Sequence, residues 1–185
     1  MRTILLGSFF ILLFFNVSAQ KYKTSSGEIS FFSETPLENI EARNEEVFCA
    51  YDSATGGIYF KVKMKKFNFK KSLMQKHFNE NYIESDKYPY STFEGQVINH
   101  DEINHSKPGK YKATVMGKLT IHGVTQVVKE DGTFTISKNQ IDGKTSFSVL
   151  LKDYDIKIPK AVIKNIAEEI NIEVNVSMNK IKPNP

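Results

Sequence analysis

The sequence predicts a mainly-β fold, an antiparallel sheet that curls into a barrel. The first observation behind this prediction is residues 110–122, which read KYKATVMGKLTIH and alternate apolar with polar side chains. Since strand side chains change face at every residue, this run is one long strand with a dry and a wet face. At about 3.3 Å per residue it would span about 43 Å, and a strand that long coils. Gly117 in mid-run permits a bend.

The second observation is that period-two alternation recurs at hairpin spacing along the chain. We expect eight or nine strands within residues 28–33, 47–51, 58–64, 91–99, 110–122, 124–129, 134–136, 145–151 and 170–178. No βαβ rhythm is present, so the strands are antiparallel and mostly sequential neighbours. A barrel of eight such strands is either packed solid or just wide enough for one small ligand.

The connections between these strands carry turn signals. Gly56-Gly57 is expected to turn the chain before residue 58, and Asp131-Gly132 is a hairpin dipeptide between strands. A further turn is expected over residues 139–143, and residues 152–155 are expected to leave the strand that precedes them.

Two helices are predicted to interrupt the strands. The first covers 72–82, because Ser72 and Gln75 have capping-box spacing and an apolar stripe follows at three-to-four spacing. The second starts at Pro159, a favoured first-turn residue. Its stripe consists of Val162, Ile163 and Ile166. Such helices could cover an end of the barrel.

The first 19 residues have the form of a signal peptide. Arg2 precedes an apolar run from residue 4 to 15, and Val17-Ser18-Ala19 offers a small-residue cleavage site. A retained membrane anchor is the alternative, but the run is shorter than the roughly 20 residues of a spanning helix. We therefore expect a signal peptide (1–19) and one domain (20–185) that is exported to the periplasm or secreted.

Charge and cysteine content exclude some classes of function. The net charge of the 185-residue chain is +4, too mild for a nucleic-acid-binding face. Six lysines form a local excess: Lys61, Lys63, Lys65, Lys66, Lys70 and Lys71. They are a solvated surface or, alternatively, a patch that touches anionic lipid headgroups transiently. The single cysteine, Cys49, lies in an apolar stretch and is expected to be a small buried side chain.

No catalytic or metal-binding pattern is visible. His100 and His105 are five residues apart in a polar turn, whereas the zinc-protease motif places two histidines four apart on a helix. His77 and His122 stand alone, where a histidine is usually structural, although either could contact a ligand headgroup. No phosphate loop, Cys-x-x-Cys pair or nucleophile elbow occurs. We expect no enzyme activity, no cofactor and no metal.

Several segments together resemble the YceI family of exported lipid-binding proteins. They read FKKSLMQKHF (69–78), ESDKYP (84–89), TFEG (92–95), GKY (109–111) and GKLTIHGVT (117–125), in the family's order. The resemblance implies a lipocalin-like, antiparallel eight-stranded barrel with an elongated apolar cavity, typically periplasmic. It also implies a long-chain ligand such as a polyisoprenoid, an isoprenoid quinone or a fatty-acid derivative.

The chain departs from the family near its front. Many members carry a histidine and a Gly-x-Phe in early strands, where residues 33–40 here read SETPLENI. The first helix also lacks the Arg-Asp-x-His-Leu form of many relatives. The headgroup end of the pocket is therefore expected to differ, and the resemblance does not extend to ligand identity.

The dry strand faces supply the candidate ligand-binding residues. These are Phe60, Val62, Phe93, Tyr111, Ala113, Val115, Leu119, Phe134, Ile136, Phe147, Val149, Ile172, Val174 and Val176. Burying each methylene of a ligand tail is favourable by about 0.8 kcal/mol, so an isoprenoid needs no ion pair to bind. The alternative is that the same side chains fill the interior and the barrel acts through its surface as an accessory module. The sequence leaves homodimer formation open.

Overall fold

The computed structural model describes residues 20–35, 39–159 and 166–181. The expected signal peptide and most of the expected second helix, including Val162 and Ile163, lie outside these residues. No helix of the described residues has the length and apolar character needed to cross a membrane.

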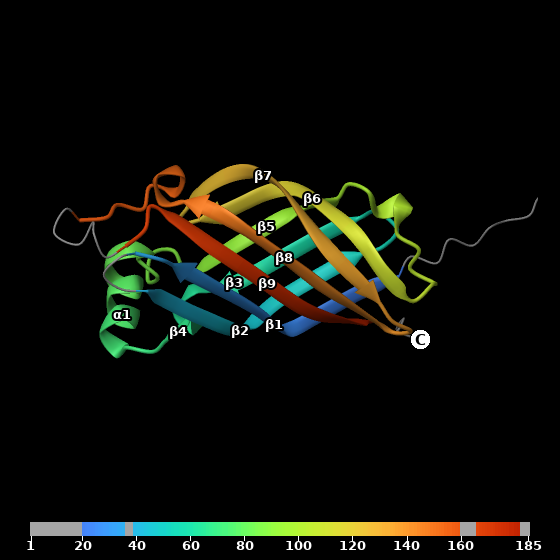
Figure 1. Cartoon of the computed structure of the whole chain (residues 1–185), viewed down its shortest axis with the longest axis horizontal. Helices are drawn as coiled ribbons and strands as arrows, with labels where there is room; N and C mark the ends of the chain where they lie inside the picture. The colour runs from blue at the N-terminus through green and yellow to red at the C-terminus, as the bar shows by residue number, and fades with distance from the viewer. Residues whose placement is uncertain (1–19, 36–38, 160–165, 182–185) are drawn as a thin grey trace, which may run out of the picture.

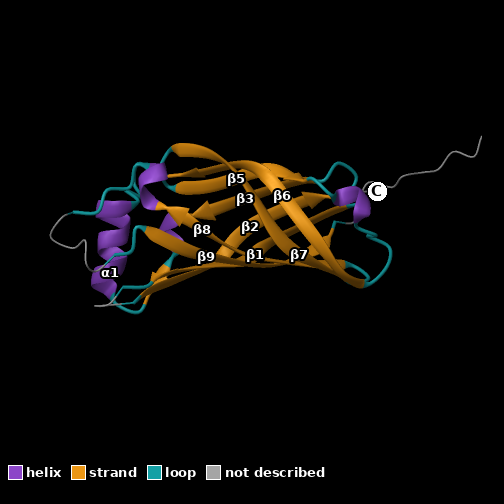
Figure 2. Ribbon diagram, turned by 45° about the horizontal axis from the view of Figure 1, so that its top comes forward, coloured by secondary structure: helices purple, strands orange, loops and turns teal. Residues whose placement is uncertain are grey.

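Eight long antiparallel strands close into a barrel (Figures 1 and 2). The strands are β1 (Lys21–Ser33), β2 (Ile40–Asp52), β3 (Gly57–Lys63), β5 (Tyr90–Val97), β6 (Gly109–Ile121), β7 (Val124–Ile136), β8 (Gln140–Leu150) and β9 (Glu169–Lys180). Their order is β1-β9-β8-β7-β6-β5-β3-β2, and β1 pairs with β2 to close the ring. The two-residue strand β4 (Asn68–Phe69) extends the pairing of β2. The predicted eight-stranded barrel is confirmed.

The long strand predicted from the sequence is β6, and it pairs with β7 over its whole length. Gly117 faces Gly95 of β5 across the ladder. A Cβ atom at Gly117 would collide with the Glu94 carbonyl oxygen and the Gly95 Cα atom, so a side chain cannot be accommodated there. The glycine pair lets β5 and β6 approach closely in the middle of the wall.

The predicted hairpin at Asp131-Gly132 is wrong. Both residues lie inside β7, so the strands expected over 124–129 and 134–136 are one strand. The break expected between residues 122 and 124 is confirmed, because the chain reverses at His122-Gly123, where φ is +52° and +77°. The glycine is used for packing, because a Cβ at Gly132 would lie 2.7 Å from the Lys144 carbonyl oxygen of β8. The Asp131 carboxylate is held on the outer face by Lys112, 2.7 Å away.

The turn expected over residues 139–143 is shorter than predicted. β8 already begins at Gln140, and the Ser137 N–H donates to the Gln140 carbonyl at 2.9 Å to close the turn. Gly143 lies within the strand, where a Cβ would come 3.2 Å from the Phe134 ring. The turn that precedes residue 58 is confirmed, with Gly56 at φ +72°.

The first predicted helix is present as α1 (Ser72–His77), which continues into a π-helical turn, η2 (Phe78–Tyr82). The capping box is wrong, because Lys71 is the N-cap residue and no side chain makes a capping hydrogen bond. Three 3-10 turns complete the described helices: η1 (Met64–Lys66), η3 (His100–Glu102) and η4 (Leu151–Tyr154). The last of these confirms the predicted exit from β8.

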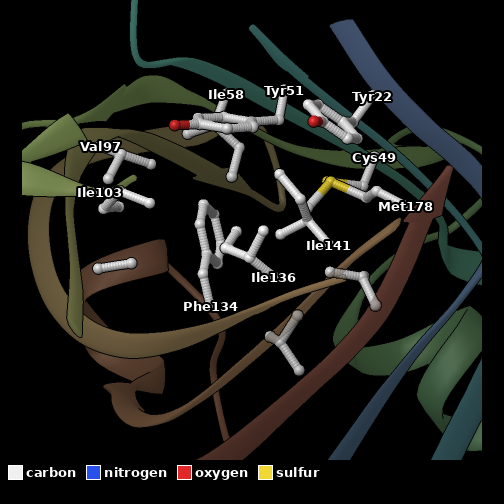
Figure 3. Close-up of a cluster of buried hydrophobic side chains, with 13 residues drawn as sticks. Tyr22, Cys49, Tyr51, Ile58, Val97, Ile103, Phe134, Ile136, Ile141 and Met178 are labelled. Atoms are coloured by element: carbon white, nitrogen blue, oxygen red, sulfur yellow. The ribbon is translucent and has the colours of Figure 1, made fainter. Parts of the chain in front are cut away.

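One end of the barrel is closed by a cluster of buried apolar side chains (Figure 3). The side chains of this closed end include Tyr22, Cys49, Tyr51, Val97, Ile103, Phe134, Ile136, Ile141 and Met178. Ile103 and His105, which follow η3, lie against it, and the Tyr51 hydroxyl hydrogen-bonds His105 Nε2 at 2.9 Å. Burial lowers the pKa of His105, and the nearby His100 adds to this effect. Cys49 is fully buried, as predicted.

The opposite end carries α1, seen at the left of Figure 1. A second cluster of apolar side chains lies there, centred on four phenylalanines with ring centroids 5.0 to 5.8 Å apart: Phe31, Phe67, Phe69 and Phe78. We call this end of the barrel, with α1 and the four phenylalanines, the helix end. Because α1 supplies no fully buried residue of its own, it covers this end instead of filling it.

His122 holds the helix end together. Its Nδ1 lies 3.1 Å from the Tyr154 carbonyl oxygen of η4, and its Nε2 lies 2.9 Å from the Glu84 carboxylate. The ring also packs edge-on against Tyr88, with centroids 4.6 Å apart. The hydrogen bond from His122 is the main cause that lowers the pKa of Glu84. His122 is therefore a structural residue of the β6–β7 turn.

The lysine-rich stretch is partly neutralised by carboxylates. Lys65 belongs to η1 and not to a strand, and it pairs with Asp86. Lys66 lies 2.6 Å from Glu46, and Lys70 lies 3.2 Å from Glu41. These pairs are exposed and contribute little stability, but they reduce the positive field that an anionic membrane would meet.

Candidate ligand-binding cavity

The barrel encloses a cavity of about 510 Å³. It extends from the closed end to α1, and its walls come from β1, β3 and β5–β9 together with η2 and η4. Inward positions of each strand supply mostly aliphatic and aromatic side chains, since alternate residues of a strand face one side. A cavity of this size and character is within the range of small-molecule binding sites, roughly 300–1,000 Å³.

Twelve of the fourteen residues predicted from the sequence line this cavity. They are Phe60, Val62, Phe93, Ala113, Val115, Leu119, Phe134, Phe147, Val149, Ile172, Val174 and Val176. Whether they contact a ligand stays a prediction. Ala113, Phe134, Val174 and Val176 also belong to the closed end and form the inner limit of the cavity.

The structure places Tyr111 and Ile136 away from the cavity. Both lie on the inward face of their strands, but at the closed end, where the interior is filled. Ile136 is 2% exposed, and the Tyr111 hydroxyl donates to the Lys107 carbonyl oxygen at 3.0 Å. Strand alternation identifies the face of a side chain but not its depth along the barrel.

Several lining residues were not among the predicted ones. They come mainly from β1, from α1 with η2, and from η4: Ile29, Phe31, Leu73, Met74, His77, Phe78, Tyr82, Leu151, Tyr154 and Ile156. The apolar stripe of the first helix was a signal for some of them, because it identified a face that had to be buried. The residues of η4 gave no comparable signal.

The helix end is where the cavity meets the surface. Lys71, Leu73, Met74 and His77 line it there, and Leu73 is 62% exposed. A large apolar side chain that borders both an apolar cavity and solvent is suited to meet a hydrocarbon tail as it enters.

Glu130 and Tyr154 are two of the polar side chains that line the cavity without a hydrogen-bond or ion-pair partner among the described residues. Glu130 of β7 pairs in register with Val115 of β6, so its side chain is on the inner face of the wall. Tyr154 of η4 is 3% exposed and lines the same cavity. Burial raises the pKa of Glu130, with a further contribution from Asp131.

The cavity contains no arrangement typical of a metal site. In the part of the chain that the structure describes, no three His, Cys, Asp or Glu side chains lie close enough together to hold an ion. Burial raises the pKa of the Cys49 thiol, which is enclosed in the closed end near Met178. What the geometry provides is an apolar volume with a few polar groups, which suits binding.

Comparison with known proteins identifies relatives of the whole barrel. The model of the YceI-like domain family matches residues 13–178. A polyisoprenoid-binding domain from Saccharophagus degradans has a similar structure, with a TM-score of 0.76, 12% identity, and coverage of 89% of this chain and 100% of that chain.

Two further solved structures have the same fold. BcnA of Burkholderia cenocepacia has a TM-score of 0.67 at 17% identity, covering 82% of this chain and 95% of its own. A YceI protein of Campylobacter jejuni has a TM-score of 0.57 at 16% identity, covering 97% and 94%. No curated protein sequence matches this chain.

Proposed function

The chain belongs to the YceI-like domain family, and from that premise we propose that it is a binding protein for a long-chain amphiphile. The hydrocarbon tail of the ligand lies in the barrel cavity, and the protein carries or sequesters it. The proposal assigns no catalytic residue.

The observation that carries the proposal is the apolar cavity of about 510 Å³ between the closed end and α1. Ten buried methylenes would contribute about 8 kcal/mol of binding free energy at about 0.8 kcal/mol each. That corresponds to a Kd near 1 μM before ordering costs are subtracted. The tail alone can therefore supply useful affinity.

The alternative, a surface-acting barrel with a filled core, is favoured only by the closed end. There Tyr51, Ile103, Ile136 and their neighbours form a cluster of buried side chains that does not line the cavity. The helix end differs, because its side chains surround open volume. We therefore favour the carrier, with the closed end as the floor of its cavity.

The ligand class follows from the shape of the volume and from the relatives. A polyisoprenoid, an isoprenoid quinone or a fatty-acid derivative is an apolar chain that such a cavity accommodates, and one structural relative is a polyisoprenoid-binding domain. We also propose that residues 1–19 are a signal peptide, so that the barrel acts in the periplasm or after secretion. Leu73 and the neighbouring lysines would then make transient contact with a membrane during transfer.

Extraction of the purified protein tests this function. Protein prepared without detergent is extracted with organic solvent, and the extract is analysed by mass spectrometry. We expect one long-chain amphiphile per barrel, released only on denaturation. Protein that yields no lipid and also fails to bind a fluorescent fatty-acid probe would contradict the carrier function.

A further inference from the structure

The barrel wall is incomplete between β7 and β8. These strands pair only from Gly132–Ile136 to Ile141–Thr145. Residues 124–131 of β7 pair with β6 but not with β8. Residues 146–150 of β8 pair with β9 but not with β7. In the described part of the chain the two strands therefore diverge from this point towards the helix end.

A second hollow lies on the outside of the wall at the point of divergence. Its volume is about 350 Å³, and it is lined by Asp131, Gly132, Thr133, Lys144, Thr145, Ser146, Glu173 and Asn175. Four of these residues also line the inner cavity: Gly132, Thr133, Lys144 and Thr145. Because Gly132 has no side chain, only a thin part of the wall separates an apolar interior from a polar surface.

Glu130 lies at the inner side of this junction, two residues before Gly132. Among the described residues it is the one carboxylate that lines the inner cavity, and no hydrogen bond or ion pair engages it there. The neighbouring Asp131 differs, because Lys112 and Thr114 bind its carboxylate at 2.7 and 2.6 Å on the outer face. A carboxyl group in an apolar wall is costly unless something hydrogen-bonds it.

Tyr154 supplies a second polar atom in the same cavity. Within the described ranges, every fully buried side-chain nitrogen or oxygen has a hydrogen-bond partner. The Tyr154 hydroxyl has no such partner there, so its oxygen is not fully buried. The hydroxyl oxygen is therefore accessible, and Tyr154, which is 3% exposed, is one of the residues that line the cavity. Burial raises the pKa of Tyr154, and the charges of Asp153 and Glu130 add to this effect, which places Glu130 within electrostatic range.

We propose that the β7–β8 junction is the headgroup site of the barrel, with Glu130 as the acceptor for an uncharged hydroxyl group at the polar end of the ligand. This inference rests on the proposed function. The ligand is then a long-chain alcohol. Its tail extends towards α1, and its hydroxyl group donates a hydrogen bond to the Glu130 carboxyl. The Tyr154 hydroxyl can donate a second hydrogen bond to a polar group of the ligand. The outer hollow gives the polar end access to water.

The same geometry disfavours an anionic headgroup. A phosphate at the junction would face the Glu130 carboxylate across a short distance in an apolar wall, where like charges repel strongly. Lys144 borders both hollows, but its exposed side chain alternates with the inward-facing Gly143 and Thr145, so its charge lies on the outer side of the wall and not beside Glu130. The site therefore selects an alcohol over the corresponding phosphate ester.

The test compares three C20 ligands on the full chain: geranylgeraniol, geranylgeranyl monophosphate and the hydrocarbon phytane. Each displaces a fluorescent probe from the wild-type protein, from Glu130→Gln and from Glu130→Leu. We expect the wild type to bind the alcohol at least tenfold more tightly than the phosphate. In Glu130→Gln the affinity for the phosphate should rise about tenfold, while the alcohol keeps an acceptor. In Glu130→Leu the alcohol should lose about tenfold and phytane nothing.

Glu94→Gln is the matched control, because Glu94 is exposed on β5 and pairs in register with Lys118 on the outer face. It removes the same charge and should leave all three affinities unchanged. If both Glu130 variants bind the three ligands as the wild type does, the headgroup site is wrong while the carrier function stands. If the wild type binds none of the ligands, including phytane, both proposals fail.

Discussion

The Val115→Trp variant is expected to lose lipid uptake by a factor of about one hundred or more while it stays folded. Val115 lies on the inner face of β6 at mid-cavity, opposite Glu130. An indole there fills space that the tail would occupy. Excluding about four methylenes costs roughly 3 kcal/mol, which is more than a hundredfold in Kd. Displacement of a fluorescent fatty-acid probe measures the effect.

Met116→Trp is the control for this change. Met116 is the next residue of β6, is 45% exposed and faces away from the cavity. The Met116→Trp variant adds the same indole ring to the same strand, but on the outer face, and should bind the probe like the wild type. Wild-type uptake by Val115→Trp with an unchanged thermal unfolding midpoint would show that the tail does not occupy this volume.

The Phe134→Ala variant is expected to lose about 3–5 kcal/mol of unfolding free energy. Phe134 is 5% exposed, and its ring meets Tyr51 edge-on with centroids 5.2 Å apart. The ring also packs against Gly143 of β8, where a Cβ atom would lie 3.2 Å from it. Removing the ring therefore leaves a cavity that no side chain of Gly143 can fill. Urea denaturation monitored by circular dichroism gives the change.

Phe48→Ala separates this effect from the general cost of losing a ring. Phe48 is only partly buried on β2, where it packs against Tyr59 outside the closed-end core. We expect it to cost no more than about 1.5 kcal/mol. Equal losses for the two variants would contradict the view that the closed end is a packed core.

Alternation predicted most of the barrel because one face of each strand is dry. β6 and β9 agree with the predicted strands within one or two residues. β1 is longer than predicted, since it starts at Lys21 and not at Glu28. Its register against β2 shifts on both sides of Gly27, and such shifts interrupt the period of two on which the prediction depended.

The sequence predicted which strand faces line the candidate site but not where the cavity begins and ends along the barrel. Misreading Asp131-Gly132 as a turn ended the predicted strand early, so the inward position of Glu130 was lost. Long-range contacts, such as Ile103 and His105 closing one end, decide which inward residues border open volume. A period in the sequence contains no information about those contacts.

A crystal structure of the protein saturated with geranylgeraniol tests directly whether the barrel holds the tail of a long-chain ligand. We expect continuous density for the hydrocarbon chain inside the barrel, from the level of Val115 to α1, with the hydroxyl end at the β7–β8 junction. Ordered water throughout the interior, or the isoprenoid bound to the outer surface, would contradict this expectation.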